Sequence, residues 1–398
     1  MNDRVEIRVG GKTYGGWKSV VIEIGMDQLT RGFKLSVTDT FPGNMDFHRL
    51  RNGDQVQLFI GDDLICTGYI DHVNVSYNGT SITVTVDGKS KTVDLVDCCP
   101  VAKYGAIASK SDNAWTGVVV GKDGKKHEIP AASVQTTSWK NIKTSEIIAS
   151  LAAPYGIAVH ATAEIGEKLT DHTVVPGEKV EESINRLITK DNLVVMDDEA
   201  GDLVIVEPGE AGECADALEL GKNILSGGAN FDASKLYSRY VVLGQHAGTD
   251  TDFGRAASED RGMSDSQLVT RPRLLVLKDK GQSSKMTCGK RADFEKRYRE
   301  AQYRAATYTV HGWRQSDGSL WKVNSLVSVS DTLLSNDGKL LVTSLSFTLS
   351  AQGMLTTLKL VPPDGYQREG VAKSTEKSSD NPWKGVVKSI TPRLKAEA

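Results

Sequence analysis

Long apolar runs are absent from this chain. None reaches the roughly 20 residues that a membrane-spanning helix needs. Residues 1–7 also lack the apolar centre of a signal peptide and lead directly into an alternating strand pattern. We therefore expect a protein that is made and first assembled in a cytoplasm, with no stable membrane insertion.

The chain also lacks a large excess of charge of one sign, and its cysteines do not form a pattern of pairs. The formal net charge is −3, whereas a dedicated nucleic-acid binder needs a basic surface to displace counterions from phosphates. The five cysteines are an odd number and include no C-x-x-C pair, which fits reduced thiols packed inside the fold. The composition argues against sequence-specific nucleic-acid binding and against a disulfide framework.

The familiar motifs of catalysis and cofactor binding are not present. Gly88-Lys89-Ser90 resembles the end of a phosphate-binding loop, but Thr83 stands where that loop requires a glycine. We interpret the acidic run 197–199 as a hairpin tip, where acidic turn residues are common, and not as a catalytic or Ca²⁺ site. The sequence predicts no enzyme, no cofactor and no metal. Carboxylates that meet only in space leave a hydrolase open as an alternative.

What the chain does contain is a series of short strand patterns. Across residues 1–100, apolar and polar residues alternate in short segments between glycine-rich turns, with a hairpin signal at Asn78-Gly79. Helical spacing follows at 144–152 and near residues 180–188. The pattern predicts a mainly β, multidomain fold with α+β insertions.

Three further segments differ from this pattern. Residues 117–129 consist of an apolar run, a lysine-rich turn and a short polar strand, which predicts an inserted, exposed hairpin. Residues 246–270 are rich in Gly, Asp and Ser and predict a loop. Residues 285–306 predict a long helix whose inner face carries Phe294 and Tyr298.

The most distinctive segment is 310–331, which reads V-H-G-W-R-Q-S-D-G-S-L-W-K-V-N-S-L-V-S-V-S-D. Asp317-Gly318 predicts a tight turn with positive φ angles, flanked by Trp313 and Trp321. Nothing in the segment suggests catalysis. We expect at least one of the two tryptophans to pack in the core of a β domain.

This segment resembles a signature of the central baseplate hub proteins of Mu-like contractile phage tails. Further short segments resemble motifs of the same family in the same order, namely 86–98, 153–157, 218–225, 240–245 and 271–273. The resemblance covers about residues 1–366. Each match is short, so the specificity comes from their order along the chain.

A weak internal repeat relates two distant segments. Residues 64–84 align without gaps to residues 340–360, and each segment consists of a strand, a polar bend and a strand. The similarity is explained either by chance between two hairpins or by two copies of one barrel. The family resemblance implies two similar β-barrel domains together with a small α+β domain.

These observations predict a division of the chain into domains and connecting segments. The expected parts are a first β-barrel at 1–104, an inserted hairpin or loop at 105–133, an α+β domain at 134–212, a second β-barrel at 213–247 and 308–362, an interrupting loop and helix at 248–307, and an extended C-terminal docking tail at 363–398.

The tail has too few apolar residues to form a core of its own. Its few apolar side chains are therefore candidate anchors for a partner protein. The residues of this candidate partner interface are Trp383, Val386, Val387 and Ile390.

The resemblance implies a structural protein of the virion, located in the tail baseplate. It implies a homotrimer that adapts the six-fold tail tube to the three-fold spike. The implied partners are the spike protein trimer, tail tube or tube-initiator proteins, and baseplate wedge proteins. The alternatives are the hub portion of a type VI secretion-like or bacteriocin particle and a baseplate-associated cell-wall hydrolase. Type VI hub chains usually continue into a spike domain, and this sequence ends soon after Pro363.

Overall fold

The structure is a computed structural model that describes residues 3–40, 50–100, 117–129, 134, 136–161, 169–191, 193–245, 260–282 and 285–366. Its contacts divide the chain into two compact units. The first consists of Met1–Glu207 and Ser344–Thr356, and the second of Pro208–Thr343 and Thr357–Ala398.

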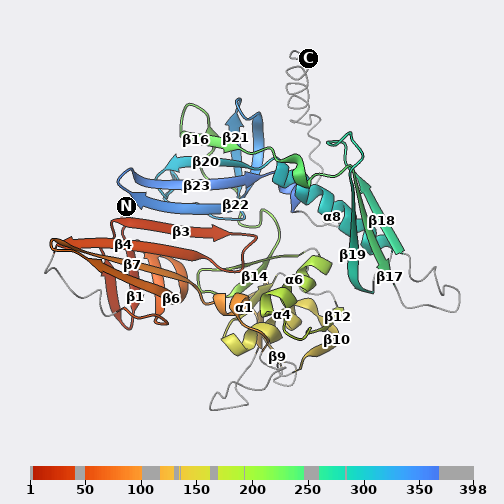
Figure 1. Ribbon diagram of the computed structural model, residues 1–398, viewed down its shortest axis with the longest axis horizontal. Coiled ribbons are helices and arrows are strands. Elements are labelled where there is room, and N and C mark those ends of the chain that lie inside the picture. Colours follow the sequence, from red (N-terminus) through yellow and green to blue (C-terminus); the bar gives the residue numbers. More distant parts are fainter. Residues whose placement is uncertain are drawn as a thin grey trace. The chain divides into compact units, whose positions relative to one another are not determined.

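The first unit begins with an antiparallel sheet in the strand order β2-β1-β5-β6-β7-β4-β3 (Figure 1). Along β7 the side chains of Ile82, Val84 and Val86 are buried while those between them are half-buried, as expected for strands with one face on a core. The strands are β1 (Val5–Val9), β2 (Lys12–Gly15), β3 (Ser19–Gly25), β4 (Gly32–Thr40), β5 (Gln55–Ile60), β6 (Asp63–Tyr77) and β7 (Ser81–Ser90).

The outer edge of β3 is occupied by residues from late in the chain. Strand β22 (Asn336–Ser350) pairs antiparallel with it, from Ser344 opposite Gly25 to Leu349 opposite Val20. All of these paired residues belong to the first unit. The paired side chains of Phe347 and Ile22 are 1% and 0% exposed, so this late segment completes the core of the first sheet.

The first unit also contains the expected α+β domain. Its five-stranded sheet has the order β13-β14-β11-β8-β9. The helix predicted near residue 180 is confirmed, because Val180, Ile184 and Leu187 are buried at helical spacing. The elements are α1 (Val93–Asp97), β8 (Gly117–Val120), β9 (Lys126–Ile129), β10 (Ser138–Lys143), α4 (Thr144–Ala152), the 3-10 turn η2 (Ala153–Tyr155), β11 (Val159–Ala161), β12 (Leu169–Thr173), α6 (Val180–Asp191), β13 (Val194–Asp197) and β14 (Leu203–Val206).

The hairpin at 117–129 forms and its residues 122–128 are exposed, as predicted, but it is part of the sheet of the α+β domain and not a separate insertion. Strand β8 pairs with β9 and also, in parallel, with β11 of the α+β domain. Val119 and Ile129 are buried in that domain's core. The β-branched run of β8 packs well on a half-buried sheet surface, and the polar turn after it remains exposed. Residues 101–116 lie outside the described residues.

The second unit is built around a sheet in which β16, β20, β23 and β22 are neighbours, and β21 and β15 extend it beyond β22. Its core contains Trp313, Val327 and Leu358, each 0% exposed. Here the elements are β15 (Leu218–Glu219), β16 (Ile224–Ala229), the 3-10 turns η3 (Ala233–Lys235) and η4 (Pro363–Gly365), β20 (Ala306–His311), β21 (Leu326–Asp331), β22 and β23 (Gly353–Val361).

A separate three-stranded sheet also lies in the second unit, with the order β18-β17-β19. It packs on α8 (Lys285–Tyr303), so the long helix predicted at 285–306 is confirmed apart from its last residues. Two predictions are wrong here. Strand β17 (Arg239–Gln245) is not part of the second large sheet, and the predicted loop contains β18 (Asp260–Asp265); β19 (Leu274–Gln282) completes the sheet.

The reason for the missed strand is a glycine in β18. A Cβ atom on Gly262 would lie 2.1 Å from backbone atoms of Cys288 and Gly289 in α8. Only glycine permits the strand and the helix to approach so closely. Glycine and polar neighbours give the segment the composition of a loop, and residues 246–259 lie outside the described residues.

The two large sheets repeat one arrangement of neighbouring strands. The first has the order β1-β5-β6-β7-β4-β3, and the second has β15-β21-β22-β23-β20-β16. The Thr85 hydroxyl group donates to Ser36 at 3.3 Å between β7 and β4, and a matching pair, Thr309 and Thr357, is 3.2 Å apart between β20 and β23. One difference is that β1 is antiparallel to β5 whereas β15 is parallel to β21.

The sequence repeat therefore corresponds to a repeated topology, but the gap-free alignment gives the wrong register. The two-residue turns after Asn78 and after Ser350 match Thr85 with Thr357, whereas the alignment, continued to the next residue, places Thr85 opposite Val361. A shift by an even number of residues keeps the same side chains on the same face, so strand alternation alone does not fix it. Pairing among the described strands does not close either sheet, and the two barrels remain a prediction.

Candidate functional site

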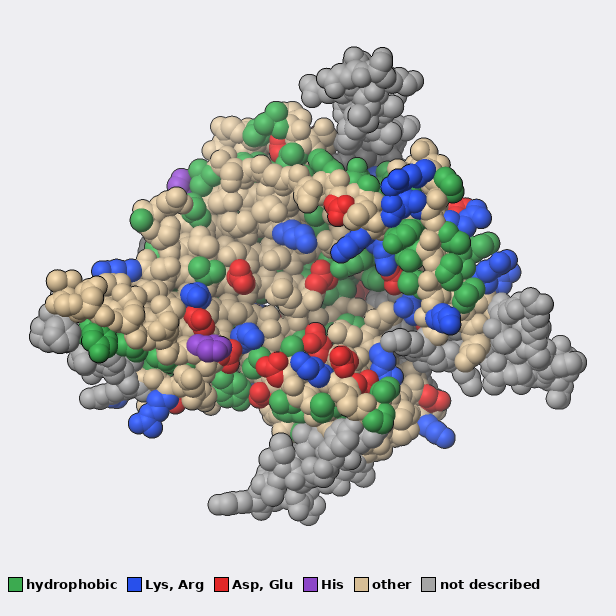
Figure 2. Space-filling view, viewed as in Figure 1, with side chains coloured by type: hydrophobic (Ala, Val, Ile, Leu, Met, Phe, Trp, Pro, Cys, Tyr) green, Lys and Arg blue, Asp and Glu red, His purple; other side chains and the backbone are tan. Residues whose placement is uncertain are grey.

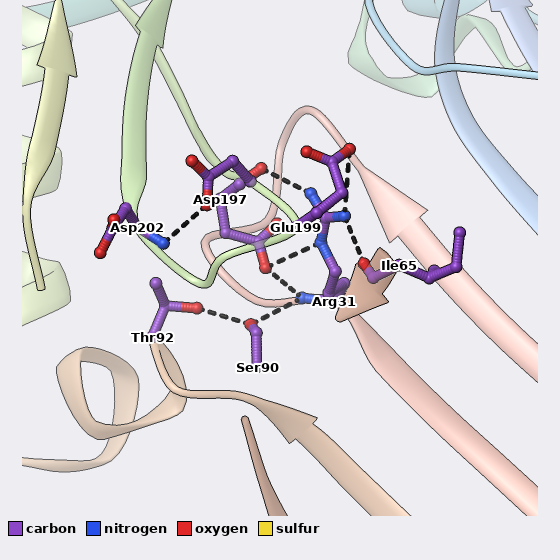
Figure 3. A network of polar contacts seen from close by, with 8 residues as sticks. Arg31, Ile65, Ser90, Thr92, Asp197, Glu199 and Asp202 are labelled. Carbon is purple, nitrogen blue, oxygen red and sulfur yellow. Dashed lines mark hydrogen bonds and ion pairs between the residues drawn. The ribbon is translucent and has the colours of Figure 1, made fainter. Parts of the chain in front are cut away.

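A buried ion pair joins the first sheet to the acidic hairpin tip of the α+β domain (Figure 3). Arg31, just before β4, and Asp197, at the end of β13, have side chains that are 2% and 1% exposed. Arg31 Nε donates to Asp197 Oδ2 at 3.1 Å, and Nη2 donates to the Asp197 carbonyl oxygen at 2.8 Å. The forked guanidinium thus binds both the side chain and the backbone of one residue.

Groups of the first sheet complete this network. Arg31 Nη1 donates to the carbonyl oxygen of Ile65 at 2.7 Å. The backbone N–H of Arg31 donates to Ser90 Oγ at 3.2 Å and to Asp197 Oδ2 at 3.0 Å, and the Ser90 hydroxyl lies 2.6 Å from that of Thr92. Three separate segments of the chain therefore meet at Arg31.

Burial sets the energetics of the pair. Burial raises the pKa of the Asp197 carboxyl group, and the Arg31 guanidinium opposes that rise. Burial alone would lower the pKa of Arg31, but the nearby carboxylates of Asp197 and Glu199 raise it, so the guanidinium stays charged. Removing one partner of such a pair typically costs about 3–5 kcal/mol, because the other charge stays buried without compensation.

A second contact at the hairpin tip depends on a glycine. Gly201 has a φ of +75°, and a Cβ atom there would lie 2.7 Å from the Thr67 carbonyl oxygen. Lys91, which follows β7, donates from Nζ to Asp202 Oδ1 at 2.7 Å. Both the positive φ and the close approach require glycine, so the tip fits against the first sheet in one position.

His160, Asp198 and Asp202 are close enough to hold a cation, with ligand atoms within 4.8 Å of one another. Their carboxylates, however, already accept hydrogen bonds from the protein. Asp202 accepts from Lys91 and from the N–H of Ala158, and Asp198 accepts from the N–H of Asp202. This is the chemistry of a hydrogen-bonded turn. Asp198 and Glu199 lie in the turn between β13 and β14, as predicted, whereas Asp197 is the last residue of β13 and is buried.

The same contacts shift two pKa values in opposite directions. Burial would raise the pKa of Asp202, but His160, whose Nε2 lies 3.6 Å from Oδ2, and the hydrogen bond from Lys91 outweigh it and lower this pKa to about 2. The Asp202 carboxylate beside its Nε2 raises the pKa of His160 above its ordinary value of 6.5, although burial acts against this. The cluster is therefore most stable with the imidazole charged and the carboxylate ionised.

The tryptophan hairpin is structural, as predicted. Trp313 and Trp321 are 0% and 4% exposed in the second unit. Among the described residues of the turn, only Gly318 has a positive φ, at +87°. The prediction of a positive φ at Asp317 is wrong, because its carboxylate accepts hydrogen bonds from the N–H and hydroxyl of Ser319 instead.

Two buried polar contacts of the second unit were not predicted from the sequence. Tyr308 donates to Asp331 Oδ2 at 3.0 Å and accepts from Asn336 Nδ2 at 2.8 Å. Asn324, with a φ of +63°, accepts from the N–H of Gly209 at 2.8 Å. The signal for Asp331 was available, since strand alternation from Val329 places it inside.

The candidate partner-interface residues Trp383, Val386, Val387 and Ile390 lie outside the described residues. A described apolar surface lies elsewhere, on the face of the three-stranded sheet opposite α8. Figure 2 shows hydrophobic side chains gathered over β17 and β18, with Lys and Arg around them. Exposed apolar residues on this face include Leu243, Met263, Leu274 and Val276.

In the described part of the chain, no helix is long and apolar enough to span a membrane.

Three family models match this chain, and together they cover more than half of it. The N-terminal domain of the Mu phage baseplate assembly protein GpP-like family matches residues 4–90. The second domain of the baseplate hub protein gp44-like family matches residues 130–207. The fourth domain of Mu phage baseplate assembly protein GpP matches residues 283–369.

Individual proteins are similar over nearly the whole chain. Baseplate hub protein gp44 of Escherichia phage Mu is 27% identical over 376 residues, which are 92% of this chain and 89% of that protein. The 43 kDa tail protein of prophage MuSo2 from Shewanella oneidensis shares the fold, with a TM-score of 0.73, 24% identity, and coverage of 92% and 99%. A tail protein from Neisseria meningitidis MC58 also shares the fold, with a TM-score of 0.69 and 19% identity. The match covers 91% of this chain and 98% of that protein.

Proposed function

Because the chain belongs to the family of Mu-like phage baseplate hub proteins, we propose that it forms a homotrimer joining a six-fold tail tube to a three-fold spike. The hub is a component of the phage tail. The adaptor role and the trimer are the proposal.

The observation that carries this proposal is the repeated strand order of the two large sheets. A chain with two similar sheets contributes two similar surfaces to any closed ring. Three such chains related by a threefold axis present six similar sheets, which is the symmetry that a six-fold tube requires. The single α+β domain and the single three-stranded sheet would keep threefold symmetry and face components of that symmetry.

The proposed domains follow the observed sheets. The first large sheet would form one barrel-like domain, and 208–229 with 306–362 would form the second. The α+β domain includes the hairpin 117–129, and 239–303 forms a separate insert between β16 and β20. The role of this insert is proposed to be contact with other baseplate components.

The proposed partners are a spike protein trimer, tail tube or tube-initiator proteins, and wedge proteins. The C-terminal tail is proposed to dock on the spike through Trp383, Val386, Val387 and Ile390. A non-enzymatic role is supported by the relative's description as a baseplate hub protein. Purified protein is accordingly expected to leave the turbidity of a peptidoglycan suspension unchanged.

Light scattering on the purified full chain tests the proposed trimer. We expect one species with three times the mass of the 43.1 kDa chain at micromolar concentration. A monomer that stays monomeric when mixed with spike and tube proteins would contradict the hub proposal.

A further inference from the structure

The two large sheets differ at one edge: β3 is covered by another strand, whereas its counterpart β16 is not covered by any described strand. This difference points to a contact between subunits. In the first unit, the edge of β3 is covered by residues 344–349 of β22. The counterpart of β3 in the second sheet is β16, and the counterpart of β22 in the first sheet is β6. If the pairing of β22 with β3 were repeated between two copies of the chain, β6 of one copy would cover the edge of β16 in the other.

Among the described strands, the outer half of β6 has a free edge. Strand β5 pairs with β6 only from Asp63 to Tyr69, and β7 pairs with its other side as far as Tyr77. Val75 and Tyr77 are 38% and 79% exposed, whereas Phe347, the counterpart of Val75, is 1% exposed. These apolar side chains are uncovered where the equivalent side chain of the other repeat is covered.

The outer edge of β16 likewise has no partner strand in the part of the chain that the structure describes. Among the described strands, β16 pairs only with β20, and four of its six residues are exposed. Leu225 and Phe231 on or beside this strand are 48% and 44% exposed. An uncovered edge with apolar side chains is a template for another strand. The outer half of β6 likewise has an uncovered edge and exposed apolar side chains.

We propose that the outer half of β6 in one subunit pairs antiparallel with β16 of a neighbouring copy of this chain. The occupant is a second copy because the equivalent pairing, β22 with β3, already exists between the two repeats. This inference rests on the proposed trimer and identifies one of its interfaces.

The repeat also gives the register of the contact. The two-residue turns after Asn78 and after Ser350 correspond, which matches Tyr77 with Leu349 and Val75 with Phe347. In the second sheet Ser226 of β16 lies opposite Thr309 of β20, and in the first sheet Ser19 of β3 lies opposite Ser36 of β4. These two pairs correspond, so Gly227 in β16 matches Val20 in β3, and Ala229 matches Ile22. The resulting cross-strand pairs are Tyr77 with Gly227, Val75 with Ala229, and Val73 with Phe231.

The backbone of β6 is oriented for this pairing. Asn78 N–H donates to the Ser81 carbonyl oxygen at 2.9 Å, and bonds to β7 recur at every second residue in an antiparallel ladder. The N–H and carbonyl groups of Val73, Val75 and Tyr77 therefore point away from β7, toward the free edge. Because the contact joins different surfaces of two copies, it is head-to-tail, and three copies close it into a ring.

Proline at Val75 is the first test. Val75→Pro removes an N–H that points to the free edge and leaves the bonds between β6 and β7 in place. We expect loss of the trimer in light scattering while the purified chain stays folded by circular dichroism. Val75→Thr retains the N–H and the β-branched shape and is the matched control, which should remain trimeric.

Engineered cysteines test the register independently. Residues directly opposite on antiparallel strands have Cα atoms about 4.5–5.5 Å apart, which falls within the range of a disulfide. The double variant Val75→Cys with Ala229→Cys is expected to give covalent trimers on oxidation, because each chain donates and accepts once. A mixture of the two single variants should give only dimers, and Val75→Cys with Gly228→Cys should give little product, since these side chains face opposite sides.

The outcomes separate this inference from the proposed function. A trimeric wild-type protein whose Val75→Pro variant is also trimeric, and whose cysteine pair gives no cross-link, would overturn the β6–β16 contact and leave the trimer standing. A monomeric wild-type protein without cross-links would overturn both. Covalent trimers from the matched pair alone would support the contact.

Discussion

At the scale of single residues, a few buried polar groups decide how the hydrophobic elements are joined. Arg31 binds three segments of the first unit, and Tyr308 binds two strands of the second. These groups are costly to bury unless every partner is in place. These groups fix the positions of the segments that they bind. Their loss is expected to lower the free energy of unfolding more than the loss of exposed charges.

Asp197→Asn tests the buried ion pair. The amide retains the shape of the carboxylate but leaves the buried Arg31 charge with only the half-exposed Glu199 carboxylate, 3.6 Å from Nη1, to compensate it. We expect the free energy of unfolding of the first unit to fall by about 3–5 kcal/mol, measured by urea denaturation. Glu199→Gln is the control, because that side chain is 55% exposed, and its loss should cost at most about 1 kcal/mol. Equal effects of both variants would contradict this account.

The pH dependence of stability tests the turn cluster. The raised pKa of His160 contributes stability that is complete below its ordinary value of 6.5 and is lost as the pH rises through the folded-state pKa. The lowered pKa of Asp202 contributes stability that is present above 3.8 and is lost as the pH falls through about 2. The combined contribution is therefore largest between pH 3.8 and 6.5.

His160→Gln is expected to destabilise the protein most in this window and progressively less at higher pH. Chemical denaturation at several pH values measures the difference from wild type. His311→Gln, at an exposed position on β20, serves as the control. A difference for His160→Gln that stays constant from acidic to alkaline pH would show that the imidazole charge has no part in the turn.

At the scale of elements, close approach decides which segments become strands. Gly262→Ala would place a methyl group against the backbone of α8, and overpacking of this kind typically costs about 1–3 kcal/mol. We expect a lower melting temperature for the second unit. Gly289→Ala is the matched control on the facing helix, where a Cβ meets nothing within 4 Å. It should stabilise the helix by about 0.5–1 kcal/mol, so opposite signs are predicted.

The C-terminal tail provides a second test at this scale. Deletion of residues 370–398 is expected to leave the trimer intact and to weaken capture of the spike protein in a pull-down. The reason is that ordering a polar segment needs apolar anchors on a partner. Alanine at Trp383 alone should weaken capture in the same direction. Equal recovery of spike with and without the tail would move that contact to the folded domains.

The elements themselves also show how far the sequence could be interpreted. Period-two alternation was sufficient to predict β6, β7, β22 and β23 and their similarity, because one face of each strand is buried. It could not fix the register, since an even shift leaves every face unchanged. Strand β18 was missed because its glycine serves contact with α8, which no local pattern reveals. The Arg31–Asp197 pair was missed because its partners are 166 residues apart.

At the scale of the whole molecule, the proposed adaptor role depends on the duplicated sheet. Two sheets with one strand order, joined in a single chain, would allow the proposed trimer to match six-fold and threefold components. The β22–β3 pairing within the chain and the proposed β6–β16 pairing between chains would then alternate around a ring. Every junction would be an antiparallel strand pair with apolar side chains on one face.

Electron cryomicroscopy of the purified oligomer tests this claim most directly. Class averages viewed along the symmetry axis should contain three subunits, with six similar densities around the ring and strong six-fold as well as threefold rotational power. Threefold power alone, with three large densities and no six-fold repeat, would contradict the adaptor mechanism. Averages of an open or two-fold assembly would contradict the trimeric hub itself.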